Sequence, residues 1–185
     1  MEDDVGDDRQ FSQASTLRNG TPVTIRVMRT DDGDRIARAF GQLDAGTVYT
    51  RFFGYRKEIP ASAIGRIAAI DFVNLAGLVV TVGAGSEETV IGSATYVGSV
   101  ASDGAKTAEV AFTIEEDYQR QGLASQLLAA LARLARRHGI ARFEAEVLAG
   151  NASMLAVFQR CGLPMRKHSE GGVAHVTLDL APPAG

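Results

Sequence analysis

Hydrophobic and polar positions alternate along residues 108–114, and the spacing of the hydrophobic positions then changes. In this segment Val110 begins an apolar series on one side, and Glu109 begins a more polar series on the other. A period of two predicts a β-strand. From Leu123 onward leucines recur at helical spacing, and Gly139 can end the helix. The pattern therefore predicts a strand, a polar turn and a long helix in succession.

Shorter elements are predicted before and after this unit. Asn19-Gly20 between two β-prone runs predicts a hairpin, and Pro22 predicts that its second strand begins there or lies on an edge. The expected elements, in chain order, are a hairpin over 15–28, helices within 35–43 and 59–70, strands at 75–82 and 90–97, and, after the long helix, a strand at 142–148, a short helix within 151–162 and closing strands at 163–168 and 173–180.

The order of these elements predicts the fold class. The connection from 108–114 through the long helix to 142–148 has the order of a βαβ unit, whose strands lie parallel and adjacent. The predicted class is α/β (α+β), with a mixed, strongly twisted central sheet of about six to seven strands and helices on both faces. We expect a single domain over 14–180, a disordered acidic tail over 1–13 and a C-terminal tail over 181–185.

The turn before the long helix contains Gln119, Gly122 and Ala124 in the pattern Gln-x-x-Gly-x-Ala. A helix start leaves backbone N–H groups unpaired and carries the positive end of the helix dipole. No Ser, Thr, Asp or Asn directly precedes Gly122 to cap these groups, and Arg120 adds a cation. Such features are typical of an anion site, most naturally for a pyrophosphate. On spacing alone, a tight turn in which the glycine serves only the conformation is an equal alternative.

This motif resembles the phosphate-binding motif Gln/Arg-x-x-Gly-x-Gly/Ala of the GNAT superfamily of acyl-CoA N-acyltransferases. A second motif, from Asn151 to Leu163, is similar to that superfamily's Asn-initiated helix followed by a Gly-Phe strand start, with Leu in place of Phe. Taken alone, such a helix is more often core packing with an Asn cap. Within the superfamily, the chain most resembles the bacterial protein lysine acetyltransferases that act on acyl-CoA synthetases. The segments that carry this likeness are 18–26, 49–54, 108–113 and 151–162.

The resemblance implies acetyl-CoA as a co-substrate. It places the pyrophosphate on amides at the start of the long helix and the pantetheine arm along the backbone of 112–114, as an added strand where the sheet splays apart. The short helix would flank the CoA from the other side. The implied acetyl-CoA-binding residues are Phe112, Thr113, Ile114, Gln119, Arg120, Gln121, Gly122, Leu123, Ala124, Ser125, Asn151, Met154 and Phe158.

Transfer of an acetyl group to an amine requires a neutral nucleophile, but a lysine amine has an ordinary pKa of about 10.4. A general base or a water relay must therefore take its proton. Glu109 is the candidate catalytic base, because it matches the family's general base on the strand that would line the cleft. We expect partial burial to raise the pKa of Glu109 and the amide N–H near Ile114 to polarise the thioester. The alternative for Glu109 is a solvent-facing strand carboxylate.

Phe158 stands where many GNAT enzymes have a Tyr that protonates the leaving thiolate. Because Phe cannot donate a proton, no general acid is assigned. Glu115, Glu116 and Asp117 are interpreted as a solvated turn. The three histidines are too scattered to indicate zinc, Cys161 is expected to pack at a helix end, and no metal is expected.

The amino-acid composition and charge indicate which cellular location and which classes of partner to expect. The net charge is −3, and without the five acidic residues among the first eight the remainder carries +2. Such a body lacks the basic footprint of a nucleic-acid-binding protein. There is no apolar run of membrane-spanning length and no signal peptide, and the single cysteine suits a cytoplasmic location. The expected partners are acetyl-CoA and a protein substrate such as an acyl-CoA synthetase, with no nucleic acid and no membrane. We expect a monomer or a homodimer.

The sequence therefore predicts an acetyl-CoA-dependent N-acetyltransferase whose acceptor is a protein lysine. Two alternatives stay open. A small-amine acetyltransferase would be favoured by an acidic small-molecule pocket. A non-catalytic module that binds acyl-CoA as a sensor or docking unit would be favoured by loss of the base, and the presence of Glu109 argues against it.

Overall fold

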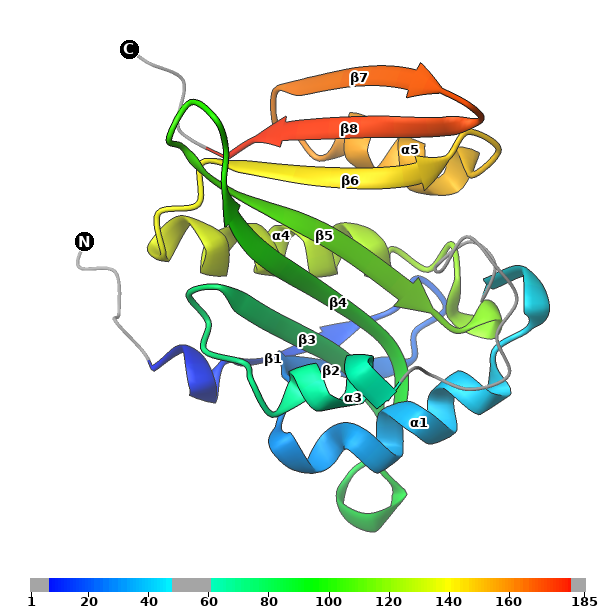
Figure 1. Ribbon diagram of the computed structural model, residues 1–185. Coiled ribbons are helices and arrows are strands. Elements are labelled where there is room, and N and C mark those ends of the chain that lie inside the picture. The colour runs from blue at the N-terminus through cyan, green and yellow to red at the C-terminus, as the bar shows by residue number, and fades with distance from the viewer. Residues whose placement is uncertain (1–6, 48–60, 181–185) are drawn as a thin grey trace.

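Eight strands form one mixed sheet in the computed structural model, which describes residues 7–47 and 61–180 (Figure 1). The strand order is β1-β2-β3-β4-β5-β6-β8-β7. The strands are β1 Ser12–Thr16, β2 Pro22–Val27, β3 Leu75–Val82, β4 Thr89–Val100, β5 Lys106–Ile114, β6 Arg142–Leu148, β7 Met165–Glu170 and β8 Val173–Asp179. The helices are α1 Gly33–Gln42, α3 Ala61–Ile67, α4 Leu123–Arg137 and α5 Ala152–Arg160, with short 3-10 turns at Asp8–Gln10, Thr30–Asp32, Gly85–Glu87 and Glu116–Tyr118.

The predicted mixed α/β fold is confirmed, and the sheet is larger than the expected six to seven strands. Both hairpins join it completely: β1 extends one edge beyond β2, and β7 forms the other edge beyond β8. The predicted parallel pairing of the strands on either side of the long helix is also confirmed. It covers only three residue pairs, from Thr107↔Arg142 to Glu109↔Glu144. Beyond Glu109 the two strands diverge, so the sheet opens in its middle (Figure 1).

Helices cover the two faces of the sheet unequally. The leucines of α4 and the apolar side of α5 pack on one face in the main core, together with the buried side chains of β2 to β6 and β8. On the other face, α1 and α3 cover only β2 to β5, in a smaller cluster around Met28, Ile67, Val79 and Val90. The second face of β6, β7 and β8 carries exposed polar residues, as the alternating burial of β6 and β8 indicates. The half of the sheet beyond β5 is therefore open on that side.

The N-terminal residues are more ordered than the sequence suggested. The expected tail over 1–13 is wrong for residues 7–13, which form a 3-10 turn and the start of β1. Asp8 accepts hydrogen bonds from Arg137 at 2.6 Å and pairs with His138 at 2.7 Å, and Arg133 lies over the Phe11 ring. An acidic residue is thus held at the end of α4, where basic side chains and the negative end of the helix dipole meet.

One buried ion pair joins the start of α1 to the sheet. Arg26 on β2 is 2% exposed and Asp32 is fully buried, and two guanidinium nitrogens donate to the carboxylate at 2.7 and 2.8 Å. Burial by itself raises the pKa of Asp32, but the hydrogen bonds from Arg26 and from the Arg29 amide outweigh it and hold that pKa below 3.8. Asp32 therefore stabilises the fold above its unfolded pKa, and this contribution is lost as the pH falls through the lower folded-state value.

We expect Arg26→Met to reduce the free energy of unfolding by about 3–5 kcal/mol at pH 7, because it leaves the Asp32 charge buried without its main partner. Urea unfolding would measure this loss. Arg166→Met is the matched control: its pair with Asp179 is exposed and spans 3.4 Å, so the change should cost at most about 1 kcal/mol. Equal stability losses in the two variants would contradict the assignment.

Candidate functional site

The opening between β5 and β6 exposes a row of backbone groups. Glu115 N donates to Ile91 O at 3.0 Å, so the odd-numbered residues of β5 make their ladder bonds with β4. Lys106 O accepts from Ala141 N at 2.8 Å, on the β6 side. By the same alternation, the N–H and C=O groups of Phe112 and Ile114 point into the opening, where β6 no longer pairs with β5. Those of Thr113, which was expected to share the contact, point to β4.

The turn at the start of α4 exposes a second set of backbone groups. Gly122 precedes the helix with φ of 91°, and no side chain caps it. Within the described ranges, the amides of residues 120–125 have no hydrogen-bond acceptor: the hydrogen bonds of this turn begin with Gln126 N, which donates to Gly122 O. Arg120 itself adopts a positive φ of 59°, which is unusual for a residue with a side chain. Consecutive unpaired amides with positive φ at Arg120 and Gly122 are suited to binding an anion. This favours a phosphate site over a turn in which the glycine serves only the backbone conformation.

Gln119 positions this turn against the end of β5. Its side-chain nitrogen donates to Ile114 O at 3.0 Å and to the Thr47 hydroxyl at 3.1 Å. The carbonyl of Ile114 is therefore already paired, and its N–H is the group left facing the opening. Gln119 thus acts on the site by fixing the distance between the open edge of β5 and the amides at the start of α4.

The three residues predicted on α5 have different environments. Asn151 caps the helix, with its side-chain oxygen accepting from Met154 N at 3.1 Å. Met154 is half-buried, whereas Phe158 is 1% exposed and meets Phe112 edge to face at 6.1 Å between ring centroids. Phe158 therefore belongs to the core and supports the strand that borders the opening. Leu123 is also a core residue, so only its backbone can take part in the site.

Glu109 lies on the last pair of residues that β5 and β6 share. Its side chain is exposed, so the expected partial burial is wrong. The reason is the uncovered face of β6 and β8: Glu144 lies directly opposite Glu109, and Glu146 and His175 complete the border of a shallow depression. Two carboxylates directly opposite each other repel, an arrangement that does not serve stability.

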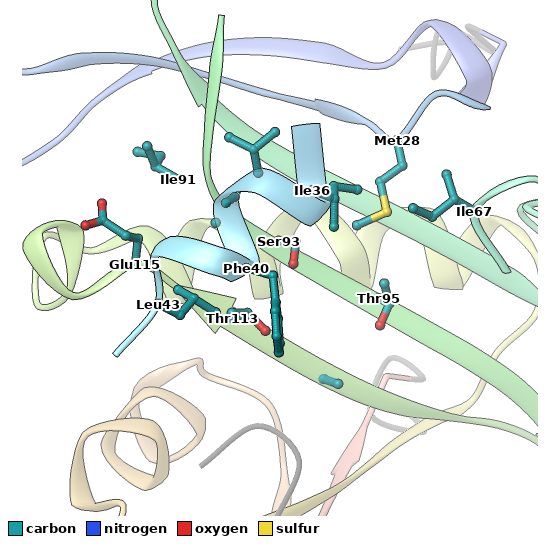
Figure 2. A pocket seen from close by; sticks show the side chains of 14 residues that line it. Met28, Ile36, Phe40, Leu43, Ile67, Ile91, Ser93, Thr95, Thr113 and Glu115 are labelled. Atoms are coloured by element: carbon teal, nitrogen blue, oxygen red, sulfur yellow. The ribbon is translucent and has the colours of Figure 1, made fainter. Parts of the chain in front are cut away.

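A cavity of about 110 Å³ lies on the same face of the sheet, between α1 and strands β4 and β5. Figure 2 shows Phe40 of α1 and Leu43, which follows the helix, beside Ser93 and Thr113, with Glu115 at one end. The wall is mostly apolar. The floor is continuous with Glu109, because the odd-numbered residues of β5 share one face.

The prediction that Glu115 belongs to a solvated turn is wrong for its carboxyl group. It is half-buried and borders the cavity. Burial, followed by the charges of Asp117 and Glu116, raises its pKa. The strand alternation already contained the signal, since residue 115 continues the odd-numbered series from Glu109. The end of the apolar pattern at Ile114 obscured it.

Other expectations concern metals and residues 49–54. In the described part of the chain, no group of three or more His, Cys, Asp or Glu residues could hold a metal ion. Cys161 is half-buried at the end of α5, as expected, and its thiol donates to Phe158 O.

The segment 49–54, one of those that carried the resemblance, lies outside the described residues. Among 7–47 and 61–180, no helix is both long and apolar enough to cross a membrane.

Comparison with known proteins adds independent findings. The sequence profile of the acetyltransferase (GNAT) family matches residues 48–163. The chain is 31% identical over 166 residues to Acetyltransferase Pat of Mycolicibacterium smegmatis; the match covers 90% of this chain and 48% of that protein, so the chain spans about half of this relative. The crystal structure of the GNAT domain of S. lividans PAT superposes with a TM-score of 0.80 at 32% identity, covering 91% of this chain and 96% of that one.

A more distant structure shares the fold alone. The structure of yncA, a putative acetyltransferase from Salmonella typhimurium with its cofactor acetyl-CoA, has a TM-score of 0.67 at 20% identity and covers 88% of this chain and 96% of that one.

Proposed function

This chain belongs to the acetyltransferase (GNAT) family, and we propose that it transfers an acetyl group from acetyl-CoA to the Nε amine of a lysine in a protein. One arrangement carries the proposal. Unpaired amides at the start of α4 lie at one end of the open edge of β5, and the carboxylate of Glu109 lies at the other. A long, anionic thioester donor suits the first end, and an amine acceptor suits the second.

The donor would lie along the open edge. Its diphosphate would accept hydrogen bonds from the amides of residues 120–125, where Gly122 has no side chain to obstruct it. Its pantetheine amides would pair with the backbone groups of Phe112 and Ile114, as an added strand does. The fit rests on the chemistry of these groups: in the described chain they are donors and acceptors without partners, apart from the Ile114 carbonyl, which accepts from Gln119.

The reaction would proceed by direct transfer. The lysine nitrogen attacks the carbonyl carbon of the thioester, the new C–N bond forms, the C–S bond breaks, and CoA leaves as a thiolate. The proton lost by the amine passes to Glu109. Phe158 has no proton to donate and is buried, so it plays no part in protonating the sulfur.

The amide that polarises the thioester is better assigned to Phe112 than to Ile114. At about 3.3 Å per residue, five residues of strand separate Ile114 from Glu109 by about 16 Å. Phe112 has its N–H on the same edge and lies two residues closer. Even from there the distance requires a water molecule between the amine and the carboxylate, so we propose a relayed rather than a direct proton transfer.

The face of the sheet around Glu109 is acidic and uncovered, which suits a positively charged group on the surface of a protein. Glu109, Glu144 and Glu146 share the open face of β5 and β6, and no helix of the described chain covers it. A protonated lysine is attracted to these carboxylates; it loses one proton to solvent to become the neutral nucleophile, and its second proton passes to Glu109 during the transfer. An exposed face of this kind is accessible to a protein surface. The mostly apolar cavity beneath α1 would instead suit a small apolar amine, which is the alternative acceptor.

An acetylation assay tests the proposal. We would incubate the protein with labelled acetyl-CoA and either a panel of acyl-CoA synthetases or a panel of small amines. The expected result is label on a lysine of a synthetase, lost when that lysine is replaced by arginine. Label confined to small amines would assign the alternative acceptor. Tight acetyl-CoA binding without transfer to any acceptor would indicate a binding module instead.

A further inference from the structure

The hairpin of β1 and β2 packs against the turn that begins α4. Asn19 N donates to the side-chain oxygen of Gln121 at 3.1 Å, and Arg18 Nη1 donates to Arg120 O at 3.2 Å. At the base of the hairpin, the Ser15 hydroxyl donates to the Gln126 side chain. These contacts join segments about a hundred residues apart. The blue hairpin and the pale green turn accordingly lie near each other in Figure 1.

Arg18 is the hairpin residue that approaches the unpaired amides. A Cβ atom placed on Gly122 would meet Arg18 Nε at 3.9 Å, and its only other neighbour would be the Gln126 side chain, also at 3.9 Å. The guanidinium group is exposed, and its contact with Arg120 O uses one of its nitrogens. It thus lies beside the space into which the glycine allows a ligand to come.

We propose that Arg18 binds the diphosphate of acetyl-CoA directly, so that the β1–β2 turn forms one side of the donor site. This inference rests on the proposed function. A guanidinium group offers several N–H donors in one plane and pairs well with phosphate oxygens. Backbone amides supply hydrogen-bond donors without a net charge. Arg18 and Arg120 together supply two positive charges, which would balance the negative charges of the diphosphate. The α4 turn and the hairpin would then hold the anion from two sides.

Calorimetric titration of acetyl-CoA into the full chain tests this role. Arg18→Gln should weaken binding about tenfold, the value of one charge-assisted hydrogen bond at an exposed position. Arg18→Lys should recover part of the loss, because it restores the charge without the planar donors. Arg9→Gln is the matched control: it removes the same charge from the 3-10 turn at the opposite end of α4 and should leave affinity unchanged.

Two further measurements separate direct binding from support of the turn. Raising the salt concentration should weaken binding of acetyl-CoA less in Arg18→Gln than in the unaltered protein, because a charge pair has been removed. The same tenfold loss should appear with acetyl-3′-dephospho-CoA, which keeps the diphosphate. Gln121→Ala, which removes the neighbouring support without changing charge, should have a smaller effect than Arg18→Gln.

The outcomes are distinct. If Arg18→Gln binds acetyl-CoA as tightly as the unaltered protein, Arg18 is not a ligand, while the proposed function stands. If Gln121→Ala causes an equal loss, or the salt dependence is unchanged, Arg18 only supports the turn. If the loss disappears with acetyl-3′-dephospho-CoA, Arg18 contacts the 3′-phosphate instead of the diphosphate. If the unaltered protein does not bind acetyl-CoA, the proposed function fails as well.

Discussion

Gly122→Glu is expected to weaken acetyl-CoA binding by at least about a hundredfold, because several charge-assisted hydrogen bonds to the diphosphate are lost together. The new side chain would enter the space beside the unpaired amides, and its carboxylate would repel the phosphates. The residue would also have to adopt a φ near 91°, which disfavours side chains and lowers stability. Isothermal titration calorimetry would measure the affinity, and thermal unfolding would measure the stability.

Gly104→Glu separates these two effects. Gly104 lies in the β4–β5 turn with φ of 82°, and nothing lies within 4 Å of the Cβ position, so the backbone strain is matched. This variant should lose a similar amount of stability and keep its affinity for acetyl-CoA. Equal affinity in Gly122→Glu and Gly104→Glu would show that the start of α4 does not bind the donor.

Glu109→Gln is expected to lower kcat about 10²- to 10⁴-fold near neutral pH while leaving the affinity for acetyl-CoA unchanged. The amide cannot accept the proton of the attacking amine, but it is nearly isosteric with the carboxylate and lies away from the amides that would hold the diphosphate. Steady-state kinetics with a lysine acceptor, measured from pH 6 to 9, would show the loss. At high pH the acceptor amine is increasingly neutral, so the difference from the unaltered protein should narrow.

Glu115→Gln is the informative comparison, because Glu115 is the other carboxylate on this face of β5. We expect it to keep kcat within about threefold, since Glu115 lies beyond the end of the strand, six residues and about 20 Å from Glu109. Burial and the neighbouring acids raise the pKa of Glu115, so its ionisation disfavours folding and the replacement should not destabilise the protein. If Glu115→Gln lost activity and Glu109→Gln did not, the base would be Glu115.

The sequence predicted the central part of the fold well because strong periodic patterns specify it. The bounds of β3 and β6 and the start of α4 agree with the structure. The end of β4 and the start of β5 were missed: the predicted strands stopped at 97 and began at 108, whereas β4 continues to Val100 and β5 begins at Lys106. In the structure that ladder continues to Val100↔Lys106, with Ser99 and Thr107 hydrogen-bonded through their hydroxyls. Because these polar residues pair with each other, this part of the two strands has no alternation of hydrophobic and polar positions from which a strand could be predicted.

Features of the site that depend on local backbone chemistry could be predicted from the sequence, whereas features that depend on tertiary packing could not. The lack of a cap before Gly122 was visible in the sequence, and so were the alternating sides of β5. The exposure of Glu109 depends on whether a helix covers β6 and β8, and the local sequence pattern does not predict that coverage. The same holds for Arg18, whose position beside Gly122 results from hairpin packing across more than a hundred residues.

A crystal structure of the protein with acetyl-CoA would test the central claim most directly. We expect diphosphate oxygens within about 3 Å of amide nitrogens in residues 120–125. We also expect the pantetheine arm to pair with Phe112 and Ile114 in the opening between β5 and β6. A donor bound elsewhere, for example in the cavity beneath α1, with these amides still unpaired, would contradict the account.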